Sequence, residues 1–444
     1  MDDLPRKGPI EAKRAWREHL ARRGDAAPAL RVGLAASFTA DTLAPFVGAA
    51  LLAGGMDAEL KIGPYNQLFQ TCLDPQGNLG GPTDVIVLLW RLEDLLLDEI
   101  GGFMAGDAEA LSRASAKLSS LAGMIRQLRG GFKGMVVAGV PPYPTGAAGN
   151  LLALDNAGGL GGLHRKLAGE FVDEIGRIEG VSLVDLDALQ RQVGIAAAFD
   201  ARKWYLYRQP FSDAFLHVAG QQIGRIVLAS RRAAKKCVVL DADNTLWGGI
   251  VGEDGIDGIQ IGDEFPGSAY RDFHKFLLGL RSRGTFLAVA SKNNEADVWE
   301  VFDKHSGMVL KREHLSAWQI NWLPKAENIP LIAESLNIGT DGLVFIDDNP
   351  MEIAYMRDAR PEVTSILLPP DPADILAAMQ ELTLFDQLEI TDEDRKRADM
   401  MRQERDREAF GAQISHTDFL KALNLKVDLF RAKTEDLGRV TQLI

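Results

Sequence analysis

The sequence predicts an α/β protein with two successive parallel-sheet domains, followed by a short C-terminal extension of helix and strand. Short apolar runs bounded by charge or glycine alternate with longer amphipathic segments, as strands and helices do in α/β domains. Several of these runs end at Asp, Ser or Asn, which suits the carboxyl ends of parallel strands, where such sheets bind ligands. A length of 444 residues is enough for two or three domains that each bury a core.

Composition and charge narrow the classes of protein that fit. The chain is 46% hydrophobic and 25% charged, ordinary values for a soluble globular protein. Its net charge of -13 argues against nucleic acid and anionic membranes as partners, so we expect neither. Two cysteines far apart in the sequence, Cys72 and Cys237, favour a reducing compartment over a disulfide framework. Because we find neither an export signal nor an apolar run of membrane-spanning length, we expect a cytoplasmic protein.

Residues 1–30 predict a short helical appendage, and residues 31–233 predict the first α/β domain. Strands are expected at four apolar runs, residues 31–39, 84–90, 134–140 and 181–185. Helices are expected at four amphipathic segments, residues 42–54, 108–129, 162–178 and 212–232. This alternation predicts a mostly parallel sheet.

The second domain begins with the stretch around which the chain is organised. The apolar run 237–240 is typical of a buried parallel strand, and two carboxylates follow it, Asp241 and Asp243. Alternation along an extended chain would point both the same way. Because acidic groups held that close repel unless a cation or a shared proton relieves them, we expect a Mg²⁺ site with a nucleophile and an acid/base. The alternative is a strand that ends in a solvated, Asp-rich turn.

Other segments of this domain carry polar residues at comparable places. The apolar run 285–290 ends at Ser291, and the run 343–346 ends at Asp347 and Asp348. Lys325 comes between these runs, directly before a predicted helix. Side chains of these types suit a phosphate or a metal at the carboxyl edge of a sheet.

The order of these motifs resembles the haloacid dehalogenase (HAD) phosphatase superfamily: DxDxT, then Ser, then Lys, then an acidic pair. The resemblance implies a HAD-like Rossmannoid domain over residues 234–380. Residues 247–255 suit a tight flap hairpin and are too short to build a lid, so we expect a capless domain. Residues 381–444 would begin a truncated acetyltransferase-like unit, with helices at 392–410 and 418–423 and a strand at 426–430.

The HAD resemblance also implies roles for individual residues. Asp241 would attack phosphorus and bind Mg²⁺, while Asp243 would act as acid/base and complete the metal shell with its backbone carbonyl. The remaining residues form two groups: Thr245, Ser291 and Lys325 at the phosphate, and Asp348 at the metal with Asp347 in the outer shell.

The residues around these motifs resemble those of a narrower family, the FkbH-like proteins, from about residue 31 onward. The segments that carry the resemblance are DADNTLWGG, VGEDG, ASKNN, NWLPKAENI and FIDDNPME, with PPYPTG and RQPFSD upstream and ITDEDRKR in the tail. The resemblance implies that the protein takes 1,3-bisphosphoglycerate and removes its acyl phosphate. The glyceryl group would then pass to the phosphopantetheine thiol of an acyl carrier protein, for polyketide extender-unit or tetronate biosynthesis. An acidic carrier protein would have to dock on local Arg and Lys.

In this family a cysteine is thought to hold the glyceryl group briefly, and the two candidates here are Cys237 and Cys72. Cys237 lies four residues before Asp241, about 13 Å away at about 3.3 Å per strand residue. A cysteine at the far end of a buried strand is more often part of the core. We therefore expect direct transfer to the carrier thiol.

The first domain partly resembles the SGNH (GDSL-type) hydrolases, with Ser37 after its first strand and Asp213 and His217 near its end. Residues 90–94 stand where that family places an Asn, and the Asp-to-His spacing is one residue wider than usual. Ser37 could instead cap the following helix, and a docking role for this domain is favoured over hydrolysis.

Two other functions remain open from the sequence. One is a plain HAD phosphatase acting on another small phosphoester, and the other is a non-catalytic scaffold in a biosynthetic complex. An alkoxide leaving group would make Asp243 indispensable as an acid, whereas an acyl phosphate would not.

Overall fold

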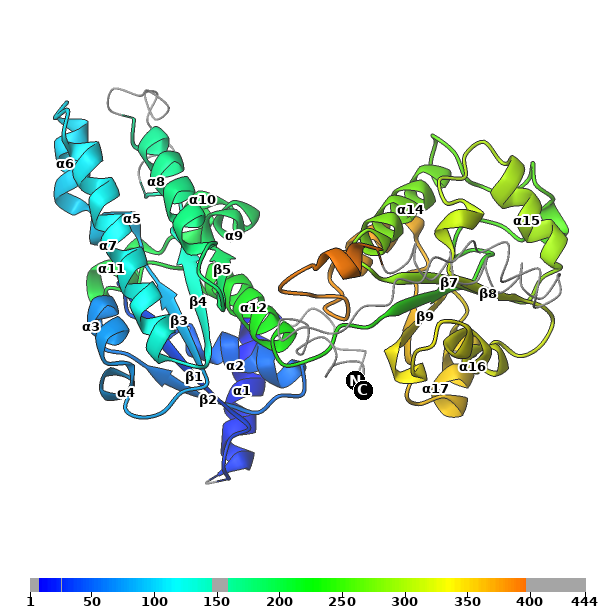
Figure 1. Cartoon of the computed structure of the whole chain (residues 1–444), viewed down its shortest axis with the longest axis horizontal. Coiled ribbons are helices and arrows are strands. Elements are labelled where there is room, and N and C mark those ends of the chain that lie inside the picture. The colour runs from blue at the N-terminus through cyan, green and yellow to red at the C-terminus, as the bar shows by residue number, and fades with distance from the viewer. Residues whose placement is uncertain (1–7, 25, 146–158, 397–444) are drawn as a thin grey trace, which may run out of the picture. The chain divides into compact units, whose positions relative to one another are not determined.

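The computed structural model describes residues 8–24, 26–145 and 159–396, and it separates into two compact units. The first comprises Met1–Ala234 with Asp386–Glu389, and the second comprises Lys235–Phe385 with Ile390–Ile444. Each unit contains one sheet between helices (Figure 1). The C-terminal helices and strand expected between residues 392 and 430 lie largely outside the described residues.

All five strands of the first sheet run parallel, in the order β2-β1-β3-β4-β5. Their bounds are β1 Leu30–Ala36, β2 Ala58–Ile62, β3 Val85–Leu89, β4 Met135–Val140 and β5 Val181–Asp185. The chain adds β2 on one side of β1 and β3 on the other, so the strand order reverses there. Such a reversal is where open α/β sheets bind ligands.

Helices cover both faces of this sheet. Their bounds are α1 Pro9–Arg23, α2 Ala44–Ala53, α3 Leu68–Leu73, α4 Pro75–Asn78, α5 Leu92–Leu95, α6 Leu97–Met104, α7 Ala110–Gly131, α8 Leu160–Ile175, α9 Leu186–Val193, α10 Ile195–Ala198, α11 Ala201–Tyr207 and α12 Asp213–Ala229. On one face, Val32 and Leu34 of β1 pack in a core with α2 and α12. On the other, Ala35 and Ile86 pack in a core with α3, α7 and α8.

Helix α1 packs against α2 rather than standing free as an appendage. Trp16 is buried, and a Cβ added at Gly48 of α2 would lie 2.5 Å from its indole. Only glycine at residue 48 leaves room for this close approach.

The second sheet is also wholly parallel, in the order β10-β9-β6-β7-β8. Its strands are β6 Cys237–Leu240, β7 Phe286–Ser291, β8 Ala317–Ile320, β9 Leu343–Asp347 and β10 Thr364–Leu367. The helices are α13 Val251–Asp254, α14 Gly267–Arg281, α15 Glu295–Lys304, η1 Arg312–His314, α16 Lys325–Ser335, η2 Thr340–Gly342, α17 Pro350–Ala359, η3 Pro372–Asp374 and α18 Ile375–Gln380.

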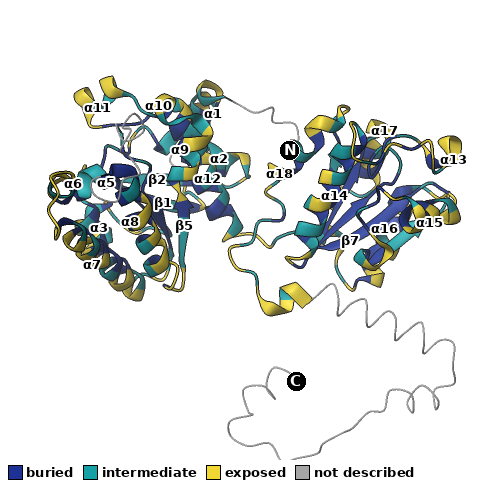
Figure 2. Ribbon diagram, turned by 90° about the horizontal axis from the view of Figure 1, so that it is seen from above, coloured by how far each residue is buried: buried dark blue, intermediate teal, exposed yellow. Residues whose placement is uncertain are grey.

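Strand β6 is buried on both sides, and its side chains alternate between two cores. Val238 and Leu240 pack in the core that includes α14, α15 and α18. Cys237 and Val239 pack in the core that includes α16 and α17. Figure 2 shows the central strands dark blue and the exposed residues on the outer sides of the helices. This double burial explains why β6 reads as an uninterrupted apolar run.

Three edge strands, β2, β8 and β10, were not expected from the sequence. Most of their residues are only partly buried, so each includes polar or charged residues and lacks the apolar run that marks a central strand. The expected flap hairpin is also different. Gly248 forms a single antiparallel bridge with Gln260, and the chain between them contains the short helix α13.

His274 of α14 is fully buried, and its Nε2 donates to the carbonyl oxygen of Leu246 at 2.8 Å. Burial lowers the pKa of His274 to about 4, below the ordinary value of 6.5. The unfolded chain therefore binds more protons between pH 6.5 and 4, so the free energy of unfolding falls as the pH falls through this range. Between pH 7 and 5 we expect this residue to account for a loss of about 2 kcal/mol.

Urea unfolding followed by tryptophan fluorescence at both pH values checks this expectation. His274→Gln keeps an N–H donor for Leu246 but does not titrate, so its loss between pH 7 and 5 should be smaller by about that amount. An equal loss in both proteins would contradict the assignment.

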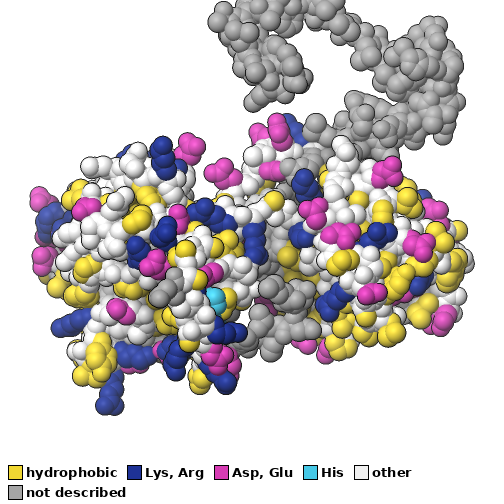
Figure 3. Space-filling model, turned by 90° about the horizontal axis from the view of Figure 1, so that it is seen from below, with side chains coloured by type: hydrophobic (Ala, Val, Ile, Leu, Met, Phe, Trp, Pro, Cys, Tyr) yellow, Lys and Arg dark blue, Asp and Glu magenta, His cyan; other side chains and the backbone are white. Residues whose placement is uncertain are grey.

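On the face shown in Figure 3, Lys and Arg side chains of the described residues are interspersed with acidic and apolar ones. Within the described ranges, no helix combines the length and the apolar character needed to cross a membrane.

Candidate active site

The end of β6 lies at the centre of the second sheet, where the strand order reverses. β6 pairs with β7 on one side and with β9 on the other, and all three strands point the same way. Their carboxyl ends therefore bring the residues that follow them to one edge. Continuing the alternation of β6 places Asp241 on the side of α16, whose first residue is Lys325.

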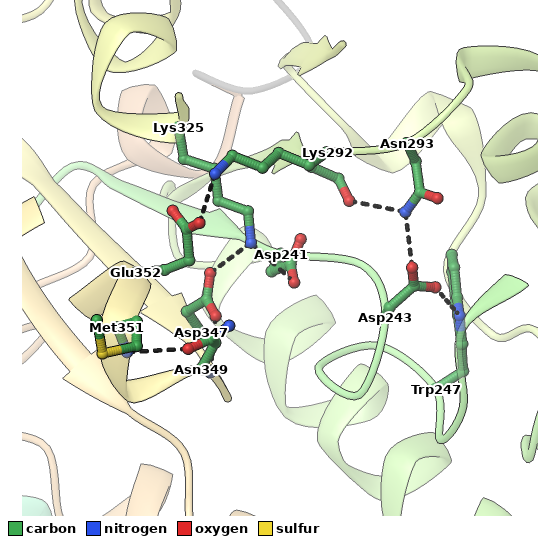
Figure 4. Close-up of polar contacts among 11 residues, drawn as sticks. Asp241, Asp243, Trp247, Lys292, Asn293, Lys325, Asp347, Asn349, Met351 and Glu352 are labelled. Atoms are coloured by element: carbon green, nitrogen blue, oxygen red, sulfur yellow. Dashed lines mark hydrogen bonds and ion pairs between the residues drawn. The ribbon is translucent and has the colours of Figure 1, made fainter. Parts of the chain in front are cut away.

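Lys325 joins two of the predicted carboxylates (Figure 4). Its Nζ lies 2.9 Å from Asp241 Oδ2 and 2.6 Å from Asp347 Oδ2. Only 4% of Lys325 is exposed, and Asp347 is fully buried. Burial acts to lower the pKa of Lys325, but the two carboxylates outweigh it and the pKa is raised. The lysine is therefore held as a cation against the carboxylates.

Asp241, Asp347 and Asp348 form a cluster that could hold a metal ion. One carboxylate oxygen from each lies within 4.8 Å of the others. Burial raises the pKa of Asp241 to about 6, opposed by Lys325 and reinforced by Asp347. Burial also raises the pKa values of Asp347 and Asp348. The positive charge of Lys325 alone therefore does not balance the negative charge of the three carboxylates.

The chemistry of the donor set fits a hard divalent cation. Asp241 Oδ1 is buried and has no hydrogen-bond partner among the described residues. An unpartnered buried carboxylate oxygen is costly, and a cation at this point would satisfy it. Carboxylate oxygens are the ligands that Mg²⁺ prefers.

Asp243 does not point with Asp241, contrary to the expectation from strand alternation. The strand ends at Leu240, and the chain turns at Asn244, whose φ is +52°. The carboxylate of Asp243 faces Trp247 and Asn293 instead (Figure 4). Among the described residues, the acidic cluster includes no side-chain oxygen of Asp243. Alternation holds only while the chain stays extended: Asp241 still pairs with β9 through its N–H, which donates to the carbonyl of Ile346 at 3.1 Å, but the turn at Asn244 follows Asp243 directly.

The residues predicted to bind phosphate lie in different surroundings. Lys325 is part of the carboxylate cluster, whereas Ser291, at the end of β7, accepts a hydrogen bond from Asn293 Nδ2 at 3.1 Å. The side chain of Thr245 is fully buried, and its hydroxyl has no hydrogen-bond partner among the described residues. Its backbone N–H donates to the carbonyl of Ala242 at 3.2 Å, which holds the turn after β6.

Sequence reasoning missed three side-chain contacts at the site, made by four residues besides Asp243. Asn293 and Trp247 bind Asp243, and Lys292 Nζ pairs with Glu352 Oε1 at 2.6 Å. These four residues lie inside the segments that carry the family resemblance. The sequence alone does not show which groups their side chains contact.

The structure does not assemble Ser37, Asp213 and His217 in the SGNH arrangement. Ser37 Oγ donates to Asp94 Oδ2 at 2.8 Å and accepts from the backbone N–H of Arg91 at 3.1 Å. Asp213 pairs with Lys13 at 2.5 Å and Lys203 at 3.0 Å. His217 of α12 packs edge-on against the ring of Phe46. Arg91 and Asp94, which lie in the segment that stands in place of the family's Asn, therefore form the hydrogen bonds of the Ser37 hydroxyl.

Both candidate thiols are buried. Cys72 lies in α3 and Cys237 begins β6. Burial raises the pKa of Cys72 to about 12 and also raises the pKa of Cys237. A thiol becomes nucleophilic as the thiolate, so neither environment favours attack on an acyl group.

Comparison with solved structures gives a match to the N-terminal part of the protein BF1531 from Bacteroides fragilis, which contains a phosphatase domain and was crystallised with Mg. The TM-score is 0.70 and the sequence identity 28%, over 86% of this chain and 100% of that one. No protein-family model matches the chain, and a comparison with curated proteins gives no match. The likeness and the Asp–Lys cluster together are consistent with an enzyme of the HAD phosphatase type, and both sheets are Rossmann-like and wholly parallel.

Proposed function

We propose that the second unit is a Mg²⁺-dependent phosphatase with Asp241 as its nucleophile. The observation that carries this proposal is the buried Lys325 bound to both Asp241 and Asp347 at the reversal point of the sheet, with Asp348 in the same cluster. The likeness to a phosphatase domain crystallised with Mg supports it. A scaffold would gain nothing from holding three carboxylates this close.

Each side chain has a defined part in this reaction. A carboxylate oxygen of Asp241 attacks phosphorus, and the bond from phosphorus to the leaving oxygen breaks while Asp243 gives that oxygen a proton. Water then attacks the phosphorus of the aspartyl phosphate, Asp243 takes its proton, and phosphate leaves. Lys325 and the hydroxyl of Ser291 stabilise the phosphoryl oxygens. Mg²⁺, held by Asp241 and Asp348 with Asp347 behind them, would supply positive charge to the phosphoryl group.

The finer proposal concerns the substrate and the acceptor. The FkbH-like motifs support 1,3-bisphosphoglycerate as the substrate and the phosphopantetheine thiol of an acyl carrier protein as the acceptor. In that reaction the carrier thiol attacks C1 and expels the acyl phosphate as inorganic phosphate. The phosphatase site then removes the C3 phosphate. Attack at the acyl phosphorus would instead release a free carboxylate, which cannot form a thioester without further activation.

Intact-mass analysis of a holo carrier protein tests this proposal. With the enzyme, Mg²⁺ and 1,3-bisphosphoglycerate, we expect the carrier to gain one unphosphorylated glyceryl group. With Asp241→Asn, the carrier should stop at the phosphoglyceryl stage, because only the second phosphate needs this nucleophile. Because both thiols are buried, Cys72→Ala and Cys237→Ala should still load the carrier.

The two alternative functions, a plain phosphatase and a non-catalytic scaffold, predict different results in the same assay. A plain phosphatase would release phosphate from small phosphoesters and leave the carrier mass unchanged. A scaffold would change neither. Loss of loading in a folded Cys72→Ala or Cys237→Ala protein would contradict direct transfer to the carrier.

A further inference from the structure

We propose that Asn293 and Trp247 are positioning residues that hold the carboxylate of Asp243 as the acid/base of the phosphatase reaction. This inference rests on the proposed function and assigns the residues that aim its proton donor. Both residues bind Asp243, which is not one of the three carboxylates of the acidic cluster that would hold the metal.

Three N–H groups bind the Asp243 carboxylate. Trp247 Nε1 donates to Oδ1 at 2.9 Å, and the backbone N–H of Val251 donates to the same oxygen at 3.0 Å. Asn293 Nδ2 donates to Oδ2 at 2.8 Å. Since both oxygens are engaged from different directions, the carboxylate has one preferred orientation.

The donors are rigid, whereas Asp243 itself is accessible. Trp247 is fully buried and its ring packs edge-on against Phe302, and Asn293 is only 5% exposed. Asp243 is half-buried. A carboxylate that can reach water does not need three protein donors to be satisfied, so their arrangement serves orientation.

Asn293 also links the acid/base to the phosphate site. The same Nδ2 donates to Ser291 Oγ at 3.1 Å, so its two hydrogens serve Asp243 and Ser291. Because Ser291 accepts from Asn293, its own hydroxyl hydrogen is available to a phosphoryl oxygen. One amide therefore sets the distance between the bound phosphate and the group that protonates its leaving oxygen.

The orientation of Asp243 matters at the steps in which it transfers a proton. As the bond from phosphorus to the leaving oxygen breaks, the proton of Asp243 passes to that oxygen and a carboxylate remains. The three N–H donors stabilise this carboxylate, which then takes a proton from the hydrolytic water. An alkoxide needs this proton, whereas a 4-nitrophenolate leaves without it.

Leaving-group dependence tests the proposal. For Asn293→Ala and Trp247→Phe, we expect kcat/KM on glycerol phosphate to fall about tenfold to hundredfold, and kcat/KM on 4-nitrophenyl phosphate to change by less than about threefold. We compare kcat/KM because it reports phosphoryl transfer to Asp241 and not the hydrolysis of the aspartyl phosphate, which both substrates share. The chain offers matched controls: Asn294→Ala removes the neighbouring amide, and Trp299→Phe removes an indole N–H bound to Glu295. Both controls should match the wild type on both substrates.

A second measurement does not depend on turnover. The indole N–H resonance of Trp247, assigned as the one lost in Trp247→Phe, should shift in Asn293→Ala because Asp243 loses its other side-chain donor. It should stay in place in Asn294→Ala. Circular dichroism confirms that each variant is folded, and Trp247→Phe retains a test if Asn293→Ala is not.

The outcomes separate this inference from the function on which it rests. Equal losses of kcat/KM on both substrates, or no loss of kcat/KM on glycerol phosphate, would overturn the positioning role. So would a leaving-group effect in Asp243→Asn that neither positioning variant shares. If Asp241→Asn retained wild-type activity, the proposed nucleophile itself would be wrong, and with it the premise of this inference.

Discussion

Asp241→Asn is expected to abolish phosphate release from phosphoesters such as glycerol phosphate, with kcat reduced at least about 10³-fold, because the amide cannot attack phosphorus. The fold should survive. Burial raises the pKa of Asp241 to about 6, so the charged form is unfavourable in the folded protein at pH 7, and asparagine removes that charge. Steady-state release of phosphate, with thermal unfolding measured in the same buffer, checks both parts.

Mg²⁺ provides the control for this variant. If Asp241 and Asp348 are ligands, Mg²⁺ should raise the Tm of the wild type, as a ligand that binds only the folded protein must, and EDTA should reverse the shift. Asp241→Asn and Asp348→Asn should lose most of it. If Mg²⁺ raised the Tm of both variants as much as that of the wild type, the metal would bind elsewhere. If Asp241→Asn turned over normally, Asp241 would not be the nucleophile.

Lys325→Met is expected to combine a loss of activity with a loss of stability. The ammonium group lies within 3 Å of two buried carboxylates, and a similar apolar side chain would leave them without a counter-charge. Breaking a buried ion pair by removing one partner costs about 3–5 kcal/mol, and removing a transition-state donor costs about 10²–10³-fold in kcat. Urea unfolding without metal and phosphate release with saturating Mg²⁺ measure the two effects.

An exposed lysine gives the matched comparison. Lys304 pairs with Glu300 at 2.8 Å on α15, where the side chain is 69% exposed. An exposed pair contributes about 0–1 kcal/mol, so Lys304→Met should change neither stability nor kcat appreciably. If Lys325→Met were as stable and as active as Lys304→Met, Lys325 would be neither a needed counter-charge for the buried carboxylates nor a catalytic residue.

Much of the fold follows from local pattern. Strands buried on both faces form nearly continuous apolar runs: every residue of β6 is apolar, and so is every residue of β9 before Asp347, so their sequences mark them plainly. Edge strands meet no such requirement. β2 contains Glu59 and Lys61 and β8 contains Gln319, and they are strands because a neighbouring strand offers its open edge.

The candidate site divides in the same way. Asp241, Ser291 and Asp347 stand at the ends of predicted strands, so the sequence indicates that they share one edge of the sheet. The structure joins Asp241 and Asp347 through Lys325 at the start of α16, whereas Ser291 binds Asn293. In the first unit the same reasoning was insufficient. Ser37 also follows a strand at a reversal point, but its hydroxyl is taken by Asp94.

The sequence by itself determined which residues end the central strands of the second unit, and so which carboxylates can meet, and it placed Lys325 at the start of a helix. Only the tertiary structure decided how they are used. It turned Asp243 away from Asp241 and toward Trp247 and Asn293, and it left one oxygen of Asp241 without a partner among the described residues. The physical reason is that periodicity places side chains only where the chain stays extended. Beyond the last strand residue, orientation depends on hydrogen bonds to groups distant in sequence.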